Sequence, residues 1–205
     1  MDDFHMPPSD DDVTALVGSR LCHDLISPLG AIGNGVELLQ MTGDAFGPEL
    51  ALISDAVRDA QARIRFFRIA FGNAGPAGRV SPREIAEILG ALYGPHGRLT
   101  VTWTPQADLP RRRAKSALLA LACAETALPM GGAIRIDEGD GALQVTATGP
   151  RIVAEPDLWA VLDSGKALRP VDPAEVQFIL LAQAAEAEGL AITCDLQADK
   201  ITIRL

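Results

Sequence analysis

The residue best suited to chemistry in this sequence is His23, in the segment SRLCHDLISPL at positions 19–29. In a helix each residue turns by about 100°, so His23 would lie about 200° from Leu21 and Leu25. Those leucines belong to an apolar stripe, and we therefore expect the imidazole to project into solvent. An exposed neutral imidazole offers a nucleophilic ring nitrogen, whereas the alternative is a surface histidine without a task.

Pro28, five residues after His23, favours the first interpretation. A proline inside a helix removes a backbone hydrogen bond and costs about 3 kcal/mol. A kink so close to an exposed histidine indicates a specifically shaped site.

Two amphipathic helices are expected to position this histidine. The first spans residues 11–41, where apolar residues recur at helical spacing: Leu21, Leu25, Ile32, Val36 and Leu39. The second spans 48–71 and carries the pattern of a coiled-coil seam: Leu50, Ile53, Val57, Ala60, Ile64, Phe67 and Phe71. With the loop TGDAFGP between them, the helices predict an antiparallel hairpin. Because two helices cannot enclose a core, we expect two copies to form a dimeric four-helix bundle.

The rest of the chain predicts an α+β fold. Residues 1–10 are expected to be a disordered acidic tail, and 11–72 the helical hairpin. The glycine-rich stretch GNAGPAG predicts a linker at 73–79, before an α/β sandwich at 80–205. Its helices are expected at 82–93, 111–128 and 173–188, and its strands at 98–103, 133–137, 143–147, 190–196 and 200–205. The pair Asp140-Gly141 predicts a hairpin turn, and the whole predicts one mostly antiparallel sheet with helices on one face.

Composition excludes several classes of function. A formal net charge of −9 argues against nucleic-acid binding, because phosphate backbones attract basic surfaces. No window holds the roughly 18 apolar residues of a membrane span, and the acidic start lacks a signal peptide, so we expect a cytoplasmic protein. Three cysteines without a CxxC motif and three scattered histidines argue against a zinc site. The basic run at 111–113, together with Lys115, is interpreted as a solvated first helical turn, with a patch for an acidic partner as the alternative.

The segment CHDLISPL resembles the H-box of sensor histidine kinases, in which an acidic residue, leucine, two variable positions, proline and leucine follow the histidine. The α/β part is similar to the ATP-binding domain of the same kinases, the GHKL class, but its nucleotide motifs are degenerate. Cys123 stands where the family has a magnesium-binding asparagine. The segment ATGPR at 147–151 lacks the adenine-binding aspartate, and VDPAEVQFILL at 171–181 lacks the glycines of the lid. The resemblance therefore implies that this chain does not bind ATP.

A histidine-bearing hairpin joined to a degenerate ATP-binding domain resembles the ChpT-type histidine phosphotransferases, as do the segments LCHDLISP and FRIAFG. This resemblance implies a phosphotransferase of the phosphorelay class. His23 would take a phosphoryl group from the receiver aspartate of a hybrid histidine kinase and pass it to the receiver domains of response regulators. Because a receiver brings its own magnesium, the chain is expected to need no cofactor.

Neighbours of His23 at helical spacing are assigned supporting roles. Asp24 is predicted to orient the ring or accept its second proton, and the alternative is an ion pair with Arg20. Arg20 is predicted to attract the acidic receiver or the phosphate, and the alternative is an ordinary surface arginine. The remaining receiver-binding surface is predicted from both helices: Ile26, Ser27, Gly30, Arg65, Phe66, Arg68 and Ile69. For Phe66 the alternative is packing against the neighbouring domain.

Two other functions stay open at this point. A divergent ATP-dependent histidine kinase would label itself from ATP, whereas a phosphotransferase needs a phosphorylated receiver. A non-catalytic module that sequesters a response regulator would keep its activity when His23 is replaced by alanine.

Overall fold

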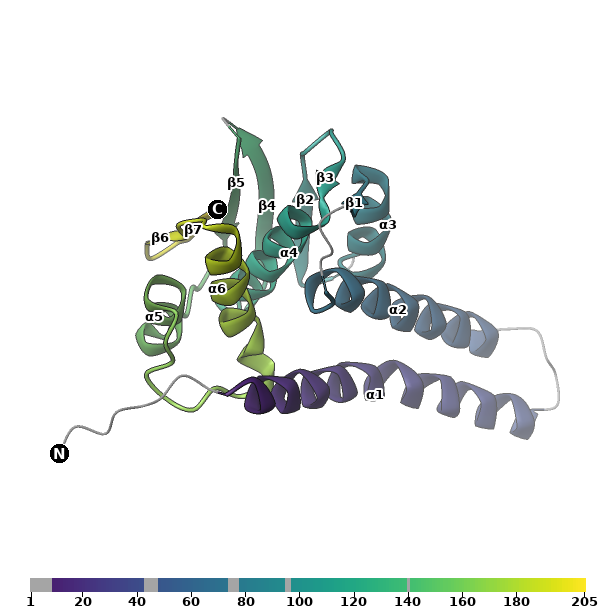
Figure 1. Cartoon of the computed structure of the whole chain (residues 1–205). Coiled ribbons are helices and arrows are strands. Elements are labelled where there is room, and N and C mark those ends of the chain that lie inside the picture. Colours follow the sequence, from purple (N-terminus) through teal and green to yellow (C-terminus); the bar gives the residue numbers. More distant parts are fainter. Residues whose placement is uncertain (1–8, 43–47, 74–77, 95–96, 140) are drawn as a thin grey trace.

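The computed structural model describes residues 9–42, 48–73, 78–94, 97–139 and 141–205. Helices α1 (Asp10–Thr42) and α2 (Pro48–Ala70) form the antiparallel hairpin that the sequence predicts (Figure 1). Helix α1 begins in a reciprocal capping arrangement, in which the Ser9 hydroxyl accepts from the Asp12 amide and the Asp12 carboxylate accepts from the Ser9 amide. The tail at 1–8, most of the loop and the centre of the linker lie outside the described residues.

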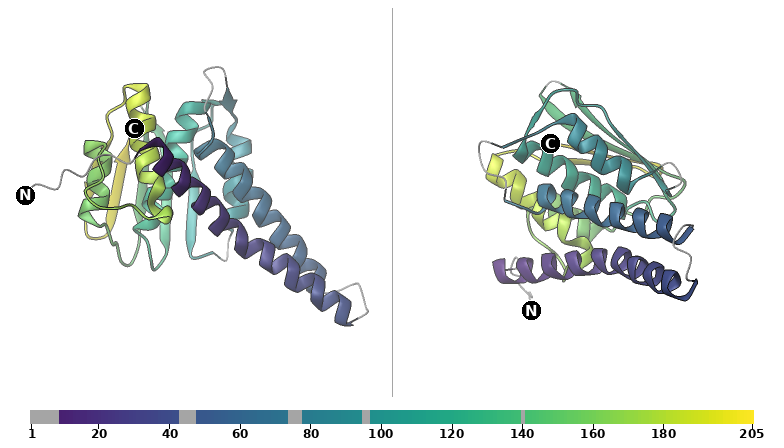
Figure 2. Two further views of the ribbon diagram at one scale, coloured as in Figure 1. Left: turned by 60° about the horizontal axis from the view of Figure 1, so that its bottom comes forward. Right: turned by 90° about the vertical axis from the view of Figure 1, so that its right-hand side faces the viewer.

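A five-stranded sheet, in the order β2-β4-β5-β7-β6, forms the centre of the C-terminal unit. Its strands are β2 (Leu99–Trp103), β4 (Gly132–Gly139), β5 (Ala142–Thr148), β7 (Lys200–Arg204) and β6 (Thr193–Leu196). Only the β2–β4 pair is parallel, so the predicted mostly antiparallel sheet is confirmed. Buried and exposed residues alternate along β4 and β5, as expected for a sheet with one covered face. Figure 2 shows the helices on that face.

The covering helices are α3 (Pro82–Leu92), α4 (Arg111–Thr126), α5 (Pro156–Ser164) and α6 (Val176–Glu188), which follows a 3-10 turn, η1 (Pro173–Glu175). The sequence did not predict α5, or the two-residue strands β1 (Arg79–Val80) and β3 (Leu109–Pro110). These elements are too short to show a period of their own. Tertiary contacts fix α5 instead, because its Trp159 ring packs edge-on against Phe178 of α6, with centroids 5.3 Å apart.

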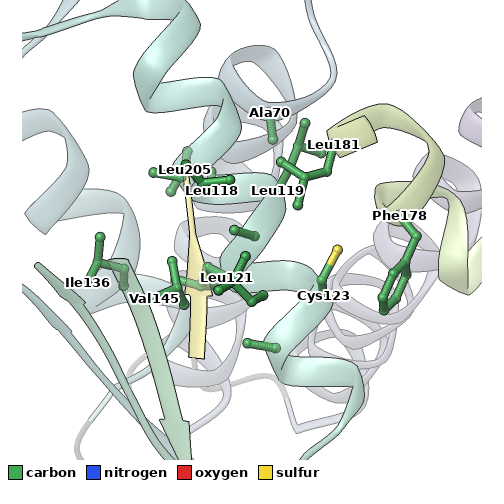
Figure 3. Packing of buried hydrophobic residues seen from close by; sticks show 14 of the residues in the cluster. Ala70, Leu118, Leu119, Leu121, Cys123, Ile136, Val145, Phe178, Leu181 and Leu205 are labelled. Carbon is green, nitrogen blue, oxygen red and sulfur yellow. The ribbon is translucent and has the colours of Figure 1, made fainter. Parts of the chain in front are cut away.

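The core is one continuous cluster that joins the hairpin to the C-terminal unit. Figure 3 shows Leu119 and Leu121 of α4 between the sheet residues Ile136 and Val145 and the helix α6. The end of α2 enters the same core, and Ala70 is fully buried there. One face of the C-terminal half of α2 is therefore covered by the neighbouring unit, while Ile64 and Arg68 stay exposed.

The basic run that opens α4 ties this junction together. The Arg111 guanidinium donates to the carbonyl of Arg68 (2.7 Å), and the Lys115 ammonium donates to the carbonyl of Gly72 (3.1 Å). Carbonyls at the end of a helix have no partner within the helix, and they attract cations. Arg113 donates to the carbonyl of Gly141. The interpretation of this run as a merely solvated first turn is therefore wrong for Arg111, Arg113 and Lys115.

A Gly-Gly turn leads into β4 and generates the first prediction. Gly131 and Gly132 have φ angles of +81° and +152°, and a Cβ atom on Gly132 would lie 2.1 Å from the carbonyl oxygen of Thr148. We expect Gly132→Ala to lower the free energy of unfolding by about 2 kcal/mol or more, because both the clash and the backbone angle oppose a side chain. Urea denaturation measures this difference.

The matched control is Gly139→Ala, at the other end of the same strand, where an added Cβ meets no atom within 4 Å. That variant should change the free energy of unfolding by about 1 kcal/mol or less. Equal destabilisation of the two variants would contradict the prediction.

Candidate functional site

His23 lies in the first half of α1, and its side chain is 85% exposed. Leu21 and Leu25 on the opposite side are half-buried, which confirms the orientation expected from helical geometry. Pro28 is buried inside α1, which nevertheless continues to Thr42. Because Pro28 has no N–H, the carbonyl of Asp24 four residues earlier cannot form its usual helical bond.

Asp24 bridges two neighbours with its two carboxylate oxygens. Its Oδ1 lies 3.1 Å from Nδ1 of His23, and its Oδ2 accepts a hydrogen bond of 2.7 Å from Nε of Arg20. The contacts that both alternatives from the sequence require are present, because the carboxylate pairs with Arg20 and also lies beside the ring. The role of Asp24 toward the ring stays a prediction. An ionised carboxylate only accepts, so this contact favours the tautomer that has the ring proton on Nδ1 and the lone pair on Nε2.

Arg20 points away from solvent, toward the C-terminal unit. Its side chain is 23% exposed, and its second donor, NH1, lies 2.6 Å from the carbonyl oxygen of Ala174 in η1. The guanidinium is thus committed to two acceptors within the chain. Its predicted contact with a receiver stays a prediction.

Three residues predicted to contact a receiver lie exposed beside His23. Ile26, Ser27 and Gly30 follow it by three, four and seven positions and are all exposed, with Ile26 at 67%. At helical spacing they form one strip with the histidine. The strip combines one large apolar side chain, Ile26, with the small residues Ser27 and Gly30.

The predicted residues of α2 divide into two groups. Arg65 and Arg68 lie at the surface and pair with Glu87 and Glu84 of α3, at 3.6 and 3.3 Å. Arg68 remains 64% exposed.

Phe66 and Ile69 belong to the core, and their predicted place on the receiver-binding surface is wrong in this structure. Phe66 is 6% exposed and Ile69 is fully buried. The Phe66 ring packs edge-on against Phe67, and the Phe67 ring stacks on Phe71 at 5.2 Å. Phe66 belongs to the core cluster that the hairpin shares with the C-terminal unit, which agrees with the alternative of packing against the neighbouring unit.

A cavity of about 400 Å³ lies behind the histidine, between the hairpin and the C-terminal unit. The hairpin contributes Arg20, Asp24, Arg63 and three phenylalanines, and the C-terminal unit contributes Tyr93, Arg98 and Glu125. The Tyr93 hydroxyl donates to Glu125 Oε2 at 2.7 Å, and burial together with this carboxylate raises the pKa of Tyr93 well above its usual value. Sequence reasoning missed this cavity because its walls come from segments that share no motif.

At the positions where the resemblance places the kinase nucleotide motifs, this chain has a buried cysteine, a capped turn and a closely packed glycine. Cys123, at the place of the kinase asparagine, is fully buried, and burial raises the pKa of its thiol well above the usual range. In place of the lid glycines the chain forms η1, capped by reciprocal bonds between Asp172 and Glu175. Gly149 lies so close to Leu128 and Gly131 that a Cβ would clash with both.

Two negative findings apply to the described residues. Within these ranges no group of three or more His, Cys, Asp or Glu side chains is placed to hold a metal ion. No helix in the described part of the chain combines the length and apolar character needed to cross a membrane.

An exposed histidine on a helical hairpin, contacted by a carboxylate and joined to an α/β unit, is the arrangement expected of a histidine-containing phosphotransfer protein. Comparisons with known proteins agree with this class. Residues 82–200 match the family described as "Histidine phosphotransferase C-terminal domain". The chain is 37% identical over 196 residues to "Protein phosphotransferase ChpT" from Brucella abortus (strain 2308), with 93% of each chain covered.

A solved structure of a bacterial phosphotransferase is 32% identical and covers 98% of both chains, with a TM-score of 0.76. The chain therefore belongs to the histidine phosphotransferase family, and phosphotransfer in a phosphorelay is its activity at the level of the family.

The three cysteines provide a test of these surroundings. Cys22 is exposed beside His23, Cys123 is buried, and burial raises the pKa of Cys194 to about 12. Only the thiolate reacts with Ellman's reagent, so a raised pKa and burial both slow the reaction. At pH 8 we expect one thiol per chain to react quickly, and Cys123 to react at least about 100-fold more slowly until the protein is unfolded.

Peptide mass analysis would identify the fast thiol, and Cys22→Ser should remove the fast phase. Fast modification of Cys123 in the folded protein would contradict the packed site described above.

Proposed function

We propose that this chain relays a phosphoryl group from the receiver aspartate of a hybrid histidine kinase, through phospho-His23, to the receiver aspartates of response regulators. The observation that supports the role of His23 is its exposed ring, whose Nδ1 contacts Asp24 and whose Nε2 faces solvent. Family membership supports the phosphotransfer itself.

The proposed step is an in-line displacement at phosphorus. The Nε2 lone pair of His23 attacks the phosphorus of the receiver's acyl phosphate, the N–P bond forms, and the aspartyl O–P bond breaks to leave a carboxylate. The ring becomes cationic while Nδ1 keeps its proton, and the Asp24 carboxylate at 3.1 Å stabilises this developing charge. The second transfer is the reverse reaction with another receiver. The magnesium that neutralises the phosphoryl oxygens belongs to the receiver, so we propose no metal site in this chain.

The proposed docking surface is the strip of Ile26, Ser27 and Gly30 beside His23, extended by Arg65 and Arg68 of α2. The exposed apolar side chain of Ile26 offers an anchor, and Ser27 and Gly30 allow a close approach. The two arginines are charge-complementary to an acidic receiver pocket, although they first have to exchange their contacts with Glu87 and Glu84.

We propose that the reaction needs no ATP on this chain. The position of the kinase asparagine holds a fully buried thiol, which offers no oxygen ligand to magnesium. The position of the glycine-rich lid holds a capped turn whose Glu175 and Asp172 side chains bond to each other's backbone. A negatively charged turn is a poor neighbour for a triphosphate.

Labelling experiments test the relay. A receiver domain carrying radioactive phosphate on its aspartate should label the wild-type chain, and the label should be acid-labile and alkali-stable. His23→Ala should reduce labelling by at least about 100-fold, because the attacking nitrogen is absent. The control, His96→Ala, changes one of the other two histidines and should be labelled normally.

The same assay separates the alternatives. Direct labelling by radioactive ATP would identify a divergent kinase. If His23→Ala binds a response regulator but the wild type accepts no phosphate from any receiver, the chain is a sequestering module.

We also propose that the chain acts as a homodimer through the hairpin. Of the twelve large apolar side chains that are exposed in the described residues, eight lie on α1 and α2. On α2 the residues of the predicted seam divide into a buried group and an exposed group. Ala60 and Phe67 are buried, while Leu50, Val57 and Ile64 are exposed and recur every seven residues. A heptad stripe exposed along one helix is the pattern that a second copy covers in a bundle.

Light scattering after gel filtration should give twice the 21.6 kDa mass of the chain. The double variant Val57→Glu, Ile64→Glu should shift the mass to a single chain, because burying two unpaired carboxylates opposes association. The control Leu168→Glu changes an exposed leucine outside the hairpin and should leave the dimer intact. A wild-type monomer at micromolar concentration would overturn the proposal.

A further inference from the structure

The contact between Arg20 and Ala174 connects the reactive histidine to the C-terminal unit. Nε of Arg20 donates to Oδ2 of Asp24 at 2.7 Å, and NH1 of the same guanidinium donates to the carbonyl oxygen of Ala174 at 2.6 Å. Asp24 in turn contacts His23. A backbone atom 151 positions away from His23 in the chain is therefore two side chains away from the imidazole.

The Ala174 carbonyl is itself fixed in place. It accepts a second hydrogen bond of 2.9 Å from Nε2 of Gln177, and the same nitrogen donates to the Thr126 hydroxyl of α4 at 3.0 Å. Gln177 is 1% exposed, so it has little freedom to change this arrangement. The amide nitrogen of Gln177 thus links α4 to η1, although the amide oxygen has no hydrogen-bond partner. Leaving a buried donor unpaired costs free energy, so the two bonds of the nitrogen oppose a movement of η1 away from α4.

The turn that carries Ala174 is held from its other side by Arg169. This guanidinium bonds to Glu155 at 2.6 Å and to Glu175 at 2.8 Å. The pairing lowers the pKa of Glu175, so the carboxylate stays ionised at neutral pH. Turn η1 is thus fixed by the ion pair of Glu175 with Arg169 and by the hydrogen bond of Ala174 with the buried Gln177.

We infer that Arg20 is a positioning residue, through which the C-terminal unit sets the orientation and the tautomer of His23. The inference rests on the proposed function and adds a role for the α/β unit in the transfer step. By anchoring Arg20, the Ala174 carbonyl fixes Oδ2 of Asp24 and so turns Oδ1 toward Nδ1 of His23. This assignment replaces a direct contact of Arg20 with the receiver.

The physical need for such an anchor follows from the exposure of the ring. The His23 side chain is 85% exposed, and among the described residues Asp24 is its polar contact. A ring with one contact keeps the Nδ1–H tautomer only while that acceptor is correctly placed. If Arg20 did not hold it, the Asp24 carboxylate would turn from His23 toward water. In part of the population the ring proton would then lie on Nε2. Those rings would lack the lone pair that attacks phosphorus.

Lysine cannot substitute for arginine in this arrangement. The planar guanidinium donates along two edges toward acceptors on different elements, whereas an ammonium is a compact point charge on a flexible stem. A role in attracting the receiver by charge would survive Arg20→Lys, and the positioning role would not. The two roles are therefore separable by one conservative variant.

The experiment compares wild type, Arg20→Ala and Arg20→Lys. Nitrogen-15 NMR of histidine-labelled protein reports the tautomer, and His23→Ala identifies the relevant signals. We expect the wild-type ring to be protonated at Nδ1, and both variants to shift proton occupancy toward Nε2. Transfer from a phosphorylated receiver should fall about tenfold in kcat in both variants, with KM for the receiver unchanged.

The control is Arg83→Ala, which removes an arginine–carboxylate pair with the same i,i+4 geometry on α3 (Arg83 Nε to Glu87 Oε1, 3.0 Å). It should leave the His23 tautomer and kcat unchanged, and thermal unfolding checks that all variants are folded. A raised KM at constant kcat, a wild-type rate in Arg20→Lys, or an unchanged tautomer in both variants would each overturn the inference. If no receiver labels the wild type, the proposed function fails, while the NMR measurement still decides the positioning role.

Discussion

The junction between the end of α2 and the start of α4 is the interaction on which the rest of this structure depends. Ile69 and Ala70 are fully buried in the core of the C-terminal unit, and Arg111 and Lys115 bind the carbonyls at the end of α2. Apolar burial supplies most of the free energy, and the hydrogen bonds fix direction and register. Because α2 is fixed in this way, α1 lies alongside η1, and Arg20 can reach the carbonyl of Ala174.

Local patterns predicted most elements of this fold, but they missed α5, β1 and β3 and did not predict how the elements pack. The exposure of His23 follows from helical geometry alone, and the β4–β5 hairpin follows from alternation and turn residues. Periodicity did not reveal that Phe66 and Ile69 are buried, because it describes which residues share a face of a helix and not what covers that face. The bond from Arg20 to Ala174 joins residues 154 positions apart and uses a backbone atom, so no residue type signals it.

The segment at the place of the kinase lid illustrates how a site can change its task. Without glycines it forms a capped 3-10 turn, braced by Arg169 and by the buried Gln177. The backbone of this turn directs the Ala174 carbonyl at Arg20. A carbonyl accepts hydrogen bonds from a guanidinium, so the same turn that Arg169 and Gln177 fix also holds Arg20.

The two sides of α1 differ in what they contact. The solvent side carries His23 with the exposed residues Ile26, Ser27 and Gly30. The inner side holds Arg20 and Asp24 at the wall of the cavity. In the relay that we propose, the phosphoryl group would approach Nε2 from the solvent side, and charge that develops on the ring would be compensated through Nδ1 from the inner side. The contact of Arg20 with Ala174 shows that the α/β unit contributes to this difference between the two sides.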